Sequence, residues 1–208
     1  MTTTMPTVTA SHRRALRAWL LWTAGFLAFP VAGIAGTAFA GRVDSPAAAL
    51  LGGLAAGAVL GLGQALLSSG RLPMLRWTAA TALGMSAGLL LGAQAVGYGT
   101  LAQIAVMGAL TGAVLGPAQA LALPPGARSR WVWAVAMPVL WPTGWAVTAS
   151  IAIPVEEQLT LFGASGAVTV SALLGILLHT LLPPPTTQAS PAPGTTHTTH
   201  ANPVGDRS

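Results

Sequence analysis

Two glutamines occupy matching positions in this chain, and their side chains are the best candidates for binding chemistry. Gln64 lies in the stretch GAVLGLGQAL, Gln119 lies in GAVLGPAQAL, and the two stretches agree at eight of ten positions. A glutamine amide offers two hydrogen-bond donors and an acceptor without carrying a charge. The pair therefore predicts either hydrogen bonds that clamp neighbouring helices or a polar vestibule that binds a solute.

Glycines recur four residues apart before each glutamine. On an α-helix this spacing forms a groove along one face, where the backbone of another helix can approach closely. Each glutamine follows the first glycine of its set by eleven residues, or about three turns, so it extends the same face. The predicted helix-packing set is Gly53, Gly57, Gly61 and Gln64, together with Gly108, Gly112, Gly116 and Gln119.

Two prolines four residues apart indicate a second candidate site. Pro138 and Pro142 lie in an apolar run, next to Trp141 and close to Gly144. Proline removes a backbone donor, and paired breaks in a membrane helix can present carbonyl groups to a ligand. The sequence predicts either a broken-helix site at these four residues or a kinked helix that is simply packed.

The ionisable residues form no catalytic pattern. His179 lies near the end of an apolar run, while Glu156 and Glu157 are neighbours, and neighbouring positions do not share a helix face. No hydrolase, zinc-protease or phosphate-loop motif occurs in the sequence, and it contains no cysteine. We therefore expect a protein that is not an enzyme and that holds no metal and no cofactor.

The composition indicates a membrane protein. Of the 208 residues, 6% are charged and 53% are hydrophobic, whereas about 25% of the residues of a soluble domain are charged. Six apolar runs are each long enough to cross a bilayer as an α-helix. The predicted spans of this all-α integral membrane fold are residues 17–40, 47–67, 77–98, 102–123, 131–152 and 161–182.

The arginines predict the orientation of these spans. With six spans, Arg42 alone falls on one side, and the other eight arginines fall on the side of the two termini. Because positive side chains near helix ends are retained in the cytoplasm, both termini are predicted to be cytoplasmic. The excess of positive charge is thereby explained by topology, and we expect no nucleic-acid partner.

The first span has an alternative interpretation as a cleaved signal peptide. Arg13 and Arg14 precede an apolar run that ends in Ala38-Phe39-Ala40, which resembles a cleavage site. The run is longer than the core of a usual signal peptide, which favours a retained helix.

A unit of about 55 residues recurs along the chain and contains two spans. Because each unit crosses the membrane twice, successive units have the same direction and form three parallel two-helix repeats. The last unit departs from the pattern, since Val170 and Leu173 follow Gly166 where the second glycine and the glutamine are expected. The simplest arrangement of the three hairpins is a bundle.

The two ends of the chain differ from the spans in composition. Residues 1–16 and 183–208 are rich in threonine or proline and lack an apolar period, so both are predicted to be disordered cytoplasmic tails. Tryptophans gather near the predicted cytoplasmic ends of the spans, as in an interfacial aromatic belt. The belt would consist of Trp19, Trp22, Trp77, Trp131 and Trp133.

Each of the two glycine-spaced helices ends in a glutamine, which a short basic loop and the dipeptide Arg-Trp follow. These residues are Gln64 with Arg76-Trp77, and Gln119 with Arg130-Trp131. In this pattern the chain resembles a group of uncharacterised bacterial polytopic membrane proteins built from glycine-rich helical hairpins. The resemblance implies a bacterial cytoplasmic (inner) membrane and brings no established activity.

The sequence therefore predicts a non-catalytic, structural or interaction component of that membrane. Its expected partners are the lipid bilayer and either another membrane protein or a second copy of the chain. The alternative function is a channel or facilitator for a small neutral solute.

Overall fold

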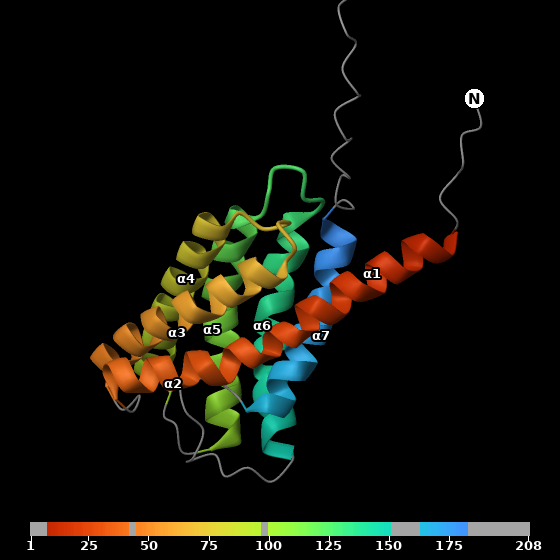
Figure 1. Cartoon of the computed structure of the whole chain (residues 1–208). Coiled ribbons are helices and arrows are strands. Elements are labelled where there is room, and N and C mark those ends of the chain that lie inside the picture. Colours follow the sequence, from red (N-terminus) through yellow and green to blue (C-terminus); the bar gives the residue numbers. More distant parts are fainter. Residues whose placement is uncertain (1–7, 42–44, 97–99, 151–162, 183–208) are drawn as a thin grey trace, which may run out of the picture.

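The computed structural model describes residues 8–41, 45–96, 100–150 and 163–182. All regular structure in these residues is helical (Figure 1). The first part of the chain forms α1 (Val8–Thr23), the short 3-10 helix η1 (Ala24–Leu27) and α2 (Ala28–Ala40). The following helices are α3 (Pro46–Leu67), α4 (Met74–Ala95), α5 (Leu101–Ala122), α6 (Arg130–Ser150) and α7 (Ala164–Leu181).

Within the described residues, six helical segments are long and apolar enough to cross a membrane. This confirms the prediction of an all-helical chain with six such segments, and it is compatible with a multi-pass membrane protein. The first is Ala15–Ala40, which comprises most of α1 together with η1 and α2, and the others are α3 to α7. The bounds of these six segments lie within three residues of the predicted bounds wherever the residues are described. Residues 97–98, 151–152 and 161–162 of the predicted spans lie outside the described residues.

One tail prediction is wrong in part, because residues 8–16 of the predicted disordered N-terminal tail form the first turns of α1. The sequence of this segment, VTASHRRAL, contains alanine, arginine and leucine, which favour helix and let the helix extend beyond its apolar part. Residues 1–7 and 183–208 of the predicted tails lie outside the described residues.

Local sequence signals start two of the spans. Ser45 precedes α3, and its side chain accepts a hydrogen bond from the backbone N–H of Ala48 at 3.2 Å. Thr100 and Gln103 form a reciprocal capping box at the start of α5. Such caps satisfy backbone donors that have no partner within the helix.

The spans are packed as a closed ring. Each helix from α2 to α6 contacts the next helix along the chain, and α7 returns to contact α1 and η1. The rod formed by α1, η1 and α2 runs obliquely to α6 and α7 (Figure 1). The ring therefore closes where the first span meets the last one.

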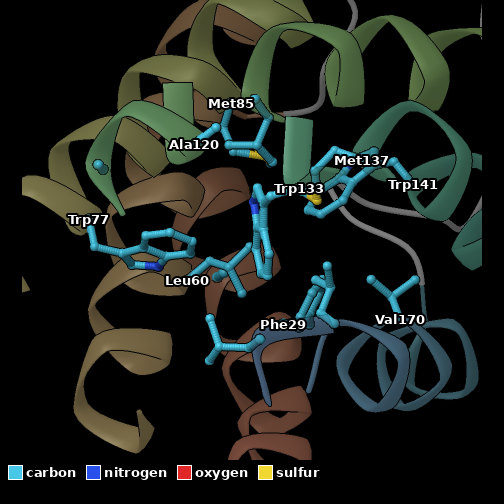
Figure 2. Close-up of a cluster of buried hydrophobic side chains, with 14 of the residues drawn as sticks. Phe29, Leu60, Trp77, Met85, Ala120, Trp133, Met137, Trp141 and Val170 are labelled. Carbon is cyan, nitrogen blue, oxygen red and sulfur yellow. The ribbon is translucent and has the colours of Figure 1, made fainter. Parts of the chain in front are cut away.

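Large side chains fill the centre of the ring (Figure 2). Phe29 from α2 lies with its ring centroid 6.1 Å from that of Trp141 from α6. All six spans contribute to this core, which includes Phe29, Leu60, Trp77, Met85, Ala120, Trp133, Met137, Trp141 and Val170.

The interpretation of Pro138 and Pro142 as a helix break is wrong. The helix α6 continues through both prolines from Arg130 to Ser150. Trp141 and Gly144 are buried in the bundle. Each proline removes one intrahelical hydrogen bond, and a membrane helix tolerates this loss where a neighbouring helix packs against it.

Candidate functional site

Gln64 is paired with a tryptophan from the next helix. The indole Nε1 of Trp77 donates a hydrogen bond to Oε1 of Gln64 at 3.0 Å. Gln64 lies in the last turn of α3, and Trp77 lies in the first turn of α4. Both side chains are buried, so the bond joins the two helices inside the bundle.

Gln119 makes the same bond at the next pair of helices and adds a second one. Its Oε1 accepts from Nε1 of Trp133 in α6 at 3.1 Å, and its Nε2 donates to Oγ1 of Thr81 in α4 at 2.9 Å. The hydroxyl of Thr81 in turn donates to the backbone oxygen of Trp77 at 2.8 Å. Gln119 in α5 thereby holds α4 and α6 together.

These bonds form one connected group across four helices, which we call the amide network: Gln64, Trp77, Thr81, Gln119 and Trp133. An indole N–H can only donate, so the amide atom that faces it must be the oxygen. The tryptophans therefore fix the orientation of both amides. The side-chain oxygens of Gln64 and Gln119 therefore both take part in hydrogen bonds within the protein.

The tryptophans of the amide network also touch each other. The ring centroids of Trp77 and Trp133 are 5.5 Å apart, and the rings meet edge to face at 72°, which is a favourable aromatic geometry. Both are 0% exposed, and Trp22 is also buried. The predicted aromatic belt is therefore wrong for these three residues, whereas Trp131 is 63% exposed.

The glycines before Gln64 lie against the backbone of α4. A methyl group at Gly57 would lie 2.7 Å from Cα of Ala82 and 2.8 Å from the oxygen of Thr81. One at Gly53 would lie 2.9 Å from Cα of Ser86. Ser86 adds an interhelical bond, since its Oγ donates to the backbone oxygen of Leu50 at 2.7 Å.

The glycines before Gln119 meet α6 in the same way. A methyl group at Gly112 would collide with the backbone oxygen of Met137 and lie 2.8 Å from Cα of Pro138. One at Gly108 would lie 3.2 Å from the nitrogen of Pro142. The prolines of the second candidate site are thus part of the α5–α6 contact.

Another group of glycines, not predicted as a packing set, joins α4 to α5. Methyl groups at Gly84, Gly88 and Gly92 would lie 3.0, 2.8 and 2.7 Å from atoms of Leu115, Thr111 and Met107, respectively. Their spacing of four is visible in the sequence and was a usable signal, although the position eleven residues after Gly84, where a glutamine would complete the pattern, is Ala95.

The last span differs from the others. Gly166 lies against the backbone oxygen of Gly144 in α6, and a methyl group at Gly175 would lie 2.8 Å from Trp22 and 2.9 Å from Trp19. The indole of Trp19 donates to the backbone oxygen of Ala172 at 3.1 Å instead of to a glutamine. Leu173, at the position expected for the glutamine, is 39% exposed and points away from the core.

A separate polar cluster closes the C-terminal end of α7. Arg71, in the connection between α3 and α4, donates to the oxygens of Leu178 at 3.2 Å and Leu182 at 3.3 Å. Its other terminal nitrogen lies 3.2 Å from Nδ1 of His179. Burial lowers the pKa of Arg71 below its ordinary value. The positive charge lies at the negative end of the helix dipole.

The described residues of the candidate site are joined by close helix contacts and by interhelical hydrogen bonds. Among them, no three His, Cys, Asp or Glu residues lie close enough to hold a metal ion. Comparisons with protein families, with curated proteins and with solved structures give no match for this chain.

Proposed function

We propose that the chain is a non-catalytic multi-pass protein of a bacterial inner membrane that acts as a structural or interaction component. The observation that carries this proposal is the burial of the amide network. Gln119 is 1% exposed and binds both Thr81 and Trp133. Its amide thus supports the packing of three helices, and interhelical bonds of this kind are worth about 0.6 to 2 kcal/mol each in membranes.

The competing function, a facilitator for a small neutral solute, requires polar groups that face a path for the solute. Gln64 and Gln119 are both buried, and each side-chain oxygen already accepts a hydrogen bond from the indole N–H of a tryptophan. Trp77 and Trp133 are themselves buried and pack against each other in the cluster of hydrophobic side chains shown in Figure 2. These contacts favour the structural role.

The proposed partners are the lipid bilayer and either another membrane protein or a second copy of the chain. Large apolar side chains point outward from the spans, such as Leu83 on α4, which is 64% exposed, and Val135 on α6, which is 69% exposed. Such faces avoid water in a bilayer and also suit contact with another apolar helix.

Both termini are proposed to be cytoplasmic, with the first span retained. Phe29 is 1% exposed, and Ala32 is fully buried. Removal of this span would uncover the faces of α3 and α7 that it contacts.

Cysteine labelling tests this orientation. The chain has no cysteine, so single cysteines introduced at the exposed positions Gly126 and Ala102 show which side of the membrane each end of the bundle faces. A membrane-impermeant thiol reagent added to intact cells should label Ala102→Cys and spare Gly126→Cys.

Solute flux in proteoliposomes tests the structural role against the facilitator. Glycerol and urea are added outside, and the rate of osmotic swelling is measured. We expect the same rate as in protein-free liposomes. The Gln64→Leu/Gln119→Leu variant is measured in the same way after its folding has been checked. A flux that requires the protein and that falls in this folded variant would show that the chain is a facilitator and not a structural component.

A further inference from the structure

Two arginines lie at the helix ends that border the amide network. Arg76, in the first turn of α4, is exposed and donates to the backbone oxygen of Leu121 at 3.0 Å. Arg130 is the first residue of α6. Because α4 and α6 both pack against α5, these two helix starts flank the last turn of α5. Both guanidinium groups therefore belong to one end of the same three helices.

The described residues contain no carboxylate that could neutralise these arginines. The four acidic residues of the chain, Asp44, Glu156, Glu157 and Asp206, all lie outside the described ranges. An arginine presents five N–H donors in a planar fork that fits the oxygens of a phosphate. One donor nitrogen of Arg76 is held by Leu121, which orients the fork and leaves other donors for a ligand.

Large apolar side chains are exposed beside both arginines. Leu75, which precedes Arg76, is 83% exposed. Trp131, which follows Arg130, is 63% exposed, and Leu121 is 59% exposed. A ligand for this surface must therefore offer an anionic group to the arginines and apolar chains to their neighbours. A free phosphate ion meets only the first requirement.

We infer that Arg76 and Arg130, with Leu75, Leu121 and Trp131, form a binding site for an anionic phospholipid. Its phosphate binds the two guanidinium groups, and its acyl chains contact the three apolar side chains. Tryptophan is well suited to this level, because its ring prefers the boundary between headgroups and acyl chains. The site requires insertion in a membrane and is independent of the structural role proposed above.

Quenching of Trp131 fluorescence tests the site directly. The protein is reconstituted in phosphatidylcholine vesicles that contain phosphatidylglycerol with brominated acyl chains, and parallel vesicles carry brominated phosphatidylcholine. The Trp131→Phe variant supplies the signal of the other tryptophans for subtraction. We expect Trp131 to be quenched at lower fractions of brominated phosphatidylglycerol than of brominated phosphatidylcholine. Equal quenching by the two lipids would overturn the proposal.

Two charge-matched variants separate a site from general attraction to an anionic surface. R76Q/R130Q should weaken the preference for phosphatidylglycerol by about fivefold for each arginine removed. R13Q/R17Q removes the same charge from exposed positions of α1 and should leave the preference unchanged. R76K/R130K keeps the charge but loses the planar fork, so it should weaken the preference, by less than R76Q/R130Q does. Equal losses in R76Q/R130Q and R13Q/R17Q would overturn the site.

Two further measurements complete the test. Thermal unfolding establishes that each variant is folded. If R76Q/R130Q unfolds, the single variant R130Q is used in its place, because it leaves the bond between Arg76 and Leu121 intact. Inorganic phosphate is added as a competitor and should have no effect. Relief of quenching by inorganic phosphate would overturn the lipid assignment in favour of a soluble anion.

Discussion

The indole nitrogen of Trp133 donates to the side-chain oxygen of Gln119 at 3.1 Å, and Trp77 is bound to Gln64 in the same way at 3.0 Å. In both cases the glutamine lies near the end of one helix and the tryptophan near the start of the next. Each bond therefore fixes the register of two antiparallel neighbours. Gln119 additionally reaches Thr81, so the two glutamines are not equivalent.

This difference predicts unequal losses of stability. Gln119→Leu should reduce the free energy of unfolding about twice as much as Gln64→Leu, because interhelical bonds contribute about 0.6 to 2 kcal/mol each. Thermal unfolding in one fixed detergent measures both variants. Gln94→Leu, at an exposed position of α4, is the control and should leave the stability unchanged. Equal or absent losses in the two buried variants would contradict this account.

Close contact between α5 and α6 predicts that Gly112 tolerates no side chain. In Gly112→Ala the new methyl group would meet the backbone of Met137 and Pro138, and overpacking of this kind costs about 1 to 3 kcal/mol. Gly33→Ala is the matched control, since a methyl group there would have nothing within 4 Å. Unfolding in detergent should show a loss for Gly112→Ala and no loss for Gly33→Ala. Similar losses for both would refute the contact.

The burial of Trp133 predicts a contrast with Trp131. Trp133→Ala removes a fully buried ring together with the donor to Gln119 and should cost about 3 to 5 kcal/mol. Trp131→Ala removes a side chain that is 63% exposed and should change stability little. Equilibrium unfolding followed by tryptophan fluorescence compares the two. A larger loss in Trp131→Ala would mean that the inward face of α6 is assigned wrongly.

The cluster at the end of α7 predicts a role for the side chain of Arg71. Arg71→Gln should release the carbonyls of Leu178 and Leu182, and hydrogen bonds to charged groups contribute about 1.5 to 3 kcal/mol. Arg128→Gln is the control, because the backbone N–H of Arg128, not its side chain, binds Leu181 at 2.9 Å. Hydrogen exchange of the last turn of α7 should accelerate in Arg71→Gln alone. Unchanged exchange would show that the bonds are not stabilising.

The candidate site could be predicted only in part. The glycine spacing and the repeated glutamine identified residues that lie in helix contacts, because one helix face follows from periodicity. The partners could not be predicted. Trp131 and Trp133 are two positions apart on α6 and so point in nearly opposite directions, and the sequence pattern Arg130-Trp131 favoured the one that is exposed.

The sequence by itself determined the helical membrane class and the six spans, because the length and hydropathy of a segment are local properties. It did not determine that α1 begins before the apolar run, since charged helix formers extend a helix without an apolar signal. Only the tertiary structure decided that α6 continues through two prolines, that Trp77 and Trp133 fill the centre, and that α7 meets α1 through Gly175 and Trp19. These features depend on which helix faces pack together, and that choice is set by the combined fit of all six spans.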